Sequence, residues 1–160
     1  LLLCVALVSF SCAESSLPVG PSPDSQPVVR EILSQTENPP GAPNRRLTLV
    51  RYTIAPGAEL VPHIHPGVQM ASIVSGTLTY RVLSGTATIH RQVAASGVPA
   101  SVENVVGPAD TELRPGDTII EEESMVHFGS NRTSGPIVIL ATLITDPGAE
   151  LSVPVSKEAQ

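Results

Sequence analysis

The chain has 160 residues, enough for one domain with a sizeable core. Its net charge is −6, and its basic residues form no cluster larger than Arg45-Arg46, which argues against a nucleic-acid partner or an anionic membrane surface. Aromatic residues make up only 2% of the chain, with no Trp, so aromatic platforms for bases or sugars are not expected.

Residues 1–13, LLLCVALVSFSCA, are uncharged and mostly apolar, and a Ser/Pro-rich stretch follows them. This pattern predicts a secretory signal peptide that lacks its start, with cleavage after Ala13, and therefore a secreted protein, extracellular or periplasmic. Cys12 could instead carry a lipid that tethers the protein to a membrane, and a longer uncleaved segment could act as an anchor. Cys4 and Cys12 are the only cysteines, so a metal site in the remaining chain must use nitrogen and oxygen donors.

A Pro/Ser-rich tether and leading segment is predicted over 14–44, in which residues 28–35 could form a strand or a short helix. From residue 45 onwards, short runs rich in Val, Ile, Leu and Thr alternate with Pro-Gly and Ser-Gly turns, as is typical of antiparallel strands. We expect one β domain over 45–145, with about eight to ten strands closed into a single antiparallel β-barrel or jelly roll, and a peripheral tail over 146–160.

One strand of this domain carries a pair of histidines. His63 and His65 are two residues apart, and a strand presents such residues on one face. Gln69 lies beyond a Pro-Gly turn and could face back towards them, and His127 in a late apolar strand offers a third imidazole. Three neutral nitrogens and one amide oxygen suit a divalent first-row metal ion with positions left for water or substrate.

Two stretches resemble the motifs of the cupin superfamily, in its small single-domain form with a conserved barrel. GAELVPHIHPGVQMASIVSG (57–76) has the spacing of the first motif, except that Gln69 stands where the family usually has Glu. GDTIIEEESMVHFGSN (116–131) resembles the second motif, with Gly116, His127 and Asn131 in place, although Glu122 replaces the usual Pro and Ser124 the usual Gly. The resemblance implies the cupin barrel, a homodimer through exposed strand edges, and Fe, Mn, Ni or Zn held by His63, His65, Gln69 and His127.

The neutral side chain of Gln69 would leave the charge of a divalent ion uncompensated, which predicts weaker metal affinity and a more acidic bound water. Alternatively, Gln69 marks a protein that has lost its metal. Within the acidic run 121–123, Glu122 and Glu123 are candidates for a base at the barrel mouth, although such runs are more often solvated turns. Apolar pocket walls are expected from five residues: Val61, Ala71, Ile73, Met125 and Phe128.

These features predict a metal-dependent oxidoreductase of dioxygenase type that acts on a small oxygen-rich organic molecule. Two alternatives stay open, because cupins carry many functions on one fold. The first is a non-catalytic protein that binds a sugar or a carboxylate, and the second is a metal-assisted isomerase or decarboxylase.

Overall fold

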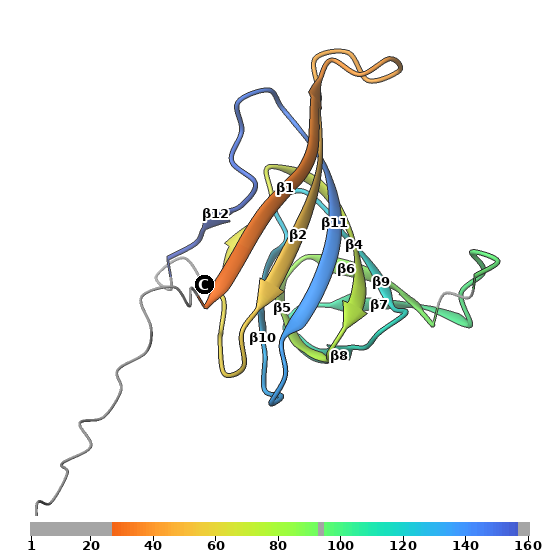
Figure 1. The fold of residues 1–160 in the computed structure, drawn as a ribbon, viewed down its shortest axis with the longest axis vertical. Helices are drawn as coiled ribbons and strands as arrows, with labels where there is room; N and C mark the ends of the chain where they lie inside the picture. The colour runs from red at the N-terminus through yellow and green to blue at the C-terminus, as the bar shows by residue number, and fades with distance from the viewer. Residues whose placement is uncertain (1–26, 93–94, 157–160) are drawn as a thin grey trace, which may run out of the picture.

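The computed structural model describes residues 27–92 and 95–156 (Figure 1). The predicted signal peptide, with Cys12, lies outside these residues. Within them the chain forms strands and turns: β1 (Val28–Glu37), β2 (Arg46–Ile54), β3 (His63–Ile64), β4 (Gly67–Ser75), β5 (Leu78–Ser84), β6 (Thr86–Arg91), β7 (Ser101–Val106), β8 (Ala109–Leu113), β9 (Thr118–Glu121), β10 (Val126–Ser130), β11 (Ile137–Thr145) and β12 (Val153–Pro154).

The strands make two antiparallel sheets. One has the order β1-β2-β11-β4-β9-β6-β7, and the other has the order β12-β3-β10-β5-β8. Alternate residues of β2, β4, β5 and β11 are buried, because a strand that faces the core on one side buries every second side chain. The structure confirms the predicted all-β class, as two antiparallel sheets that form a jelly roll.

The sheets extend beyond the range predicted for the domain on both sides. The segment at 28–37 is a strand, β1, which pairs with β2 along its whole length and leaves Val29, Ile32 and Leu33 exposed. At the other end, β12 pairs with β3. The predicted homodimer through strand edges stays a prediction.

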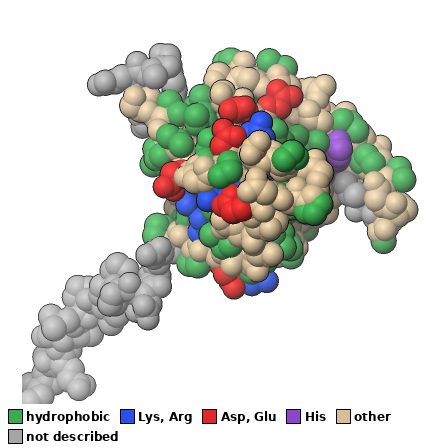
Figure 2. Space-filling view, turned by 90° about the horizontal axis from the view of Figure 1, so that it is seen from above, with side chains coloured by type: hydrophobic (Ala, Val, Ile, Leu, Met, Phe, Trp, Pro, Cys, Tyr) green, Lys and Arg blue, Asp and Glu red, His purple; other side chains and the backbone are tan. Residues whose placement is uncertain are grey.

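The surface mixes apolar and charged side chains. On the face seen in Figure 2, hydrophobic side chains lie among acidic and basic ones. The described residues contain no helix that is long and apolar enough to span a membrane.

The turn between His65 and β4 depends on a glycine. Gly67 has a φ of 141°, and a side chain there would clash with the carbonyl oxygen of Ile144 on β11. This close approach lets β4 run beside β11, so that Gln69 lies next to the end of β3.

Candidate metal centre

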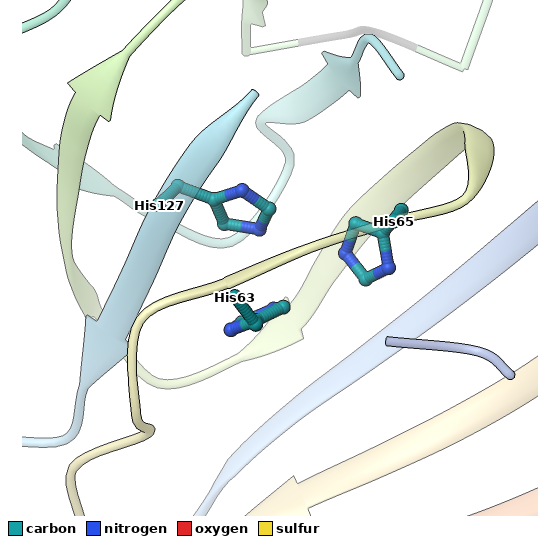
Figure 3. Close-up of side chains that lie close together, drawn as sticks. All are labelled: His63, His65 and His127. Atoms are coloured by element: carbon teal, nitrogen blue, oxygen red, sulfur yellow. The ribbon is translucent and has the colours of Figure 1, made fainter. Parts of the chain in front are cut away.

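Three buried histidines gather between the two sheets. His127 on β10 is the direct cross-strand partner of His63 on β3, and His65 follows β3 immediately. One nitrogen atom of each ring lies within 4.8 Å of the corresponding atoms of the other two, close enough to bind one ion. Figure 3 shows the three rings turned towards a common space. The donor set is consistent with a divalent metal ion, as the sequence predicts.

The backbone fixes which nitrogen of each ring faces the centre. The Nδ1 atoms of His63, His65 and His127 lie 2.9, 2.6 and 3.2 Å from the carbonyl oxygens of Val61, Leu151 and Met125. A carbonyl can only accept a hydrogen bond, so each Nδ1 carries a hydrogen and donates it. In the neutral rings, Nε2 is therefore left with a free lone pair, which is the form that binds a metal.

A carboxylate lies beside the cluster, and it comes from the neighbouring strand. Glu121 ends β9 and is the direct cross-strand partner of Gln69 on β4. Its Oε2 lies 3.2 Å from Nε2 of His65 and its Oε1 lies 3.4 Å from Nε2 of His127. Glu121 is thus a buried acid beside this centre, although Gln69 stands where the family usually has Glu.

Two neutral groups hold this carboxylate. The hydroxyl of Tyr80 donates to Oε1 at 2.8 Å, and the side-chain amide of Gln69 donates to Oε2. The same amide nitrogen lies 3.1 Å from Nε2 of His65, whereas Oε1 of Gln69 is buried without a hydrogen-bond partner among the described residues. Tyr80 is buried in the core with Leu78 and Val82 of the same strand, and its hydroxyl reaches the carboxylate beside the cluster.

The electrostatics of the cluster follow from burial and from Glu121. Burial, together with the neighbouring charge of His127, lowers the pKa of His63 to about 4. Burial would also lower the pKa of His65, but the hydrogen bond and the charge of Glu121 outweigh it and raise that pKa. Burial and the charge of Glu121 raise the pKa of Tyr80 well above its ordinary value, so Tyr80 stays protonated and donates.

The centre lies in a pocket of about 240 Å³. Val61, Ala71 and Ile73 line it, with Val61 mostly exposed. Met125 and Phe128, also expected there, do not. Met125 is a buried core residue whose side chain and backbone lie close to Gly85. Phe128 points to the other face of β10 from His127, because neighbouring residues of a strand alternate.

The polar groups of the pocket include several that the sequence did not indicate. Arg30 on β1 lies with its guanidinium carbon 5.6 Å from the ring centre of Tyr52 and donates to Ser152 at 3.2 Å. Tyr52 lines the pocket, and its hydroxyl is buried without a hydrogen-bond partner among the described residues. Burial raises the pKa of Tyr52 to about 12.

The acidic run 121–123 also differs from expectation. Glu122 and Glu123 are exposed on the turn after β9 and do not line the pocket, whereas Glu121 does. A signal for this was present in the sequence: Ile119 and Glu121 share a face of β9, so an inward Ile119 takes Glu121 inwards with it.

Comparison with known proteins identifies the family of this chain. The sequence matches the family described as Cupin over residues 21–158. The chain belongs to the cupin family. The cupin motifs at 57–76 and 116–131 supply all three histidines of the cluster.

One curated relative is Germin-like protein 3-1 of Oryza sativa subsp. japonica, 32% identical over 134 residues, which are 78% of this chain and 48% of the relative. The cupin chain thus spans about half the length of the curated relative it matches. Solved structures with similar folds include an oxalate oxidase, with 18% identity, 68% of this chain and 46% of that chain covered, and a TM-score of 0.48. Another is the protein SPY1581 of Streptococcus pyogenes, with 16% identity, 76% of each chain covered, and a TM-score of 0.47.

Proposed function

We propose that this cupin binds one divalent first-row metal ion (Fe, Mn, Ni or Zn) through His63, His65 and His127. With Fe or Mn it would work as an oxidoreductase of dioxygenase type on a small oxygen-rich organic molecule. We also propose that the protein is secreted, because residues 1–13 have the apolar pattern of a signal peptide.

The observation that carries this proposal is that three imidazole nitrogens lie within 4.8 Å of one another inside a pocket. All three rings are fixed by hydrogen bonds to backbone carbonyls, so their lone pairs are aligned before any ion binds. A site prepared in this way loses little side-chain entropy on binding, which favours metal affinity. A bound ion would supply Lewis-acid activation of a substrate oxygen and, with Fe or Mn, one-electron redox chemistry.

The pocket supports a small substrate. Its volume of about 240 Å³ lies below the range of roughly 300 to 1,000 Å³ that is usual for drug-sized ligands. Its apolar side chains exclude water from the reacting groups: Ile54, Ala71, Ile73, Leu78, Leu113, Ile119 and Ile139. Arg30 on its exposed side and the hydroxyl of Tyr52 would bind an anionic or hydroxyl oxygen of the substrate and orient the molecule.

Metal content of the purified protein tests the first half of the proposal. We expect about one ion per chain by elemental analysis, and less than about a tenth of that in His65→Ala, because a ligand contributes more than the outer partners of a metal site do. His90→Ala is the matched control, since His90 lies on β6 and takes no part in the cluster, and it should keep its metal. Equal metal content in the wild type and in His65→Ala would contradict the proposal.

Oxygen consumption tests the second half. The protein loaded with Fe(II) or Mn(II) is mixed with a panel of flavonols, diketones, phenols and small hydroxy acids, and we expect dioxygen uptake with at least one class. Substrate turnover without oxygen would instead establish the isomerase or decarboxylase alternative. Binding without any turnover would establish a non-catalytic ligand-binding cupin.

A further inference from the structure

The acid that is missing at position 69 is present one strand away. Gln69 and Glu121 face each other directly across β4 and β9, and both are buried. Directly opposed residues of an antiparallel pair have Cβ atoms about 4.5 to 5.5 Å apart, so two long side chains can reach the same point from either position.

The carboxylate of Glu121 faces the ring nitrogens that would bind a metal ion. His65 and His127 have their ring hydrogens on Nδ1, so in the neutral form their Nε2 lone pairs face the carboxylate oxygens at 3.2 and 3.4 Å. Two acceptors at that distance repel each other unless a cation, either a metal ion or a proton on the ring, lies between them. Bond lengths of about 2.0 to 2.2 Å place two adjacent ligand atoms of one metal ion about 3 Å apart, which is close to the spacing seen here.

Gln69 is placed to hold the carboxylate. Its amide nitrogen donates to Oε2 of Glu121, and the reverse orientation of the amide would bring two acceptor oxygens together. Among the described residues, the ion-pair partners of Glu121 are the two histidines, and its other neighbours, Gln69 and Tyr80, are neutral. The fold therefore supplies donors for this carboxylate but no fixed positive charge.

We propose that Glu121 is the carboxylate ligand of the metal ion, and that Gln69 is a positioning residue that holds Glu121 rather than a ligand. This inference rests on the proposed function, because it assigns a ligand to the same metal. It restores the donor set of three nitrogens and one anionic oxygen, with the oxygen supplied by β9 and not by β4. The net charge of a divalent centre then falls by one unit.

The test compares four chains: the wild type, Glu121→Gln, Gln69→Ala, and the exchange variant Gln69→Glu/Glu121→Gln. Affinity for Mn(II) is measured by calorimetry, and the coordination sphere is read from the visible absorption spectrum of the Co(II)-loaded protein. Loss of an outer partner costs roughly 10- to 100-fold in affinity, so we expect Glu121→Gln to lose more than about 100-fold and Gln69→Ala to stay within that range. The exchange variant should recover to within about tenfold of the wild type, because the acid again reaches the ion.

The Co(II) spectrum separates a ligand from a residue that only positions one. It should change in Glu121→Gln and keep the wild-type band positions in Gln69→Ala. Glu122→Gln is the matched control for the removal of a charge next to the site, and it should leave both affinity and spectrum unchanged, since Glu122 is exposed. Circular dichroism confirms that each variant is folded.

Three results would overturn the assignment in distinguishable ways. If the wild type binds metal while Glu121→Gln keeps the wild-type affinity and spectrum, Glu121 is not a ligand and the proposed function still holds. If the spectrum changes in Gln69→Ala and not in Glu121→Gln, Gln69 is the ligand. If the wild type binds no metal at all, both the assignment and the proposed function are wrong.

Discussion

Two buried carboxylates with different surroundings lie at the two ends of β9, one directly before the strand and one at its last residue. Asp117, directly before the strand, accepts hydrogen bonds from the backbone amides of Gln92 and Arg114 and from the guanidinium of Arg91, at 2.9, 3.0 and 3.0 Å. Glu121, four residues later, is held by neutral donors and faces histidine lone pairs. Both carboxylates are almost fully buried.

The difference separates a structural acid from a functional one. A buried charge is tolerated when the fold supplies an opposite charge and enough donors, as Arg91 and two amides do for Asp117. At Glu121 the fold supplies the donors and leaves room for a cation, either a proton on His65 or a metal ion. At neutral pH the first site should therefore matter for stability with or without metal, and the second mainly when metal is present.

The largest expected effect is stabilisation by metal. With Mn(II) at a hundred times its dissociation constant, the free energy of unfolding of the wild type should rise by about 2.7 kcal/mol, because the ion binds the folded state. Urea denaturation with and without Mn(II) measures this. His65→Ala should show no increment, while Asp117→Asn should keep it, and an equal increment in His65→Ala would remove the distinction between the two sites.

Removing the charge of Asp117 comes next. Asp117→Asn should lower the free energy of unfolding by about 2 kcal/mol without metal, because Arg91 loses its buried partner and a backbone amide loses its acceptor. The control is Asp110→Asn, since the ion pair of Asp110 with Arg81 is exposed, and its effect should stay within about 0.5 kcal/mol. If the two variants had the same urea midpoint, burial would add nothing to the contribution of Asp117 to stability.

The contribution of Asp117 should also depend on pH. Burial would raise its pKa, but the amides of Arg114 and Gln92 and the charge of Arg91 outweigh burial and lower it below its ordinary value. Because the folded state holds the proton less tightly than the unfolded chain, this contribution is complete above the unfolded pKa of about 3.9 and is lost as pH falls through the lower folded value. The stability gap between the wild type and Asp117→Asn should therefore be full at pH 7 and smaller at pH 3, by urea denaturation. A gap that widens at pH 3 would contradict this sign.

The smallest expected effect is that of Glu121→Gln in metal-free protein. With a chelator at pH 8, this change should alter the free energy of unfolding by less than about 1 kcal/mol, because it leaves no protein cation unpaired and keeps an acceptor for Tyr80. Chemical denaturation beside Asp117→Asn measures the contrast directly. A loss as large as that of Asp117→Asn would make Glu121 a structural acid as well.

Much of the centre could be predicted from local rules. The two-residue period of a strand places His63 and His65 on one side, and the spacing of two motifs brings in His127. Gln69 was also expected at the centre, and it is there, but its contacts depend on which residue faces it across the sheet. Its ligand role stays a prediction that competes with the assignment to Glu121.

The residues that were misplaced lie after the end of β9 and on or next to β10. The sequence has three consecutive glutamates at 121–123, which are identical in character. Because β9 ends at Glu121, this residue is buried, while Glu122 and Glu123 lie in the exposed turn that follows. Met125 and Phe128 were expected at the pocket because both are apolar and near His127. One packs in the core and the other lies on the opposite face of β10.

The sequence by itself determined the all-β fold, the cupin motifs and the three imidazoles, because strand alternation and motif spacing are local properties of the chain. Only the tertiary structure decided that Glu121 meets Gln69, that Leu151 orients His65, and that Arg30 reaches the pocket. The physical reason is register. Which residues of distant strands face one another depends on how the strands pair and how the two sheets close. The contact between Gln69 and Glu121 joins residues 52 positions apart in the chain, and the contact between His65 and Leu151 joins residues 86 positions apart.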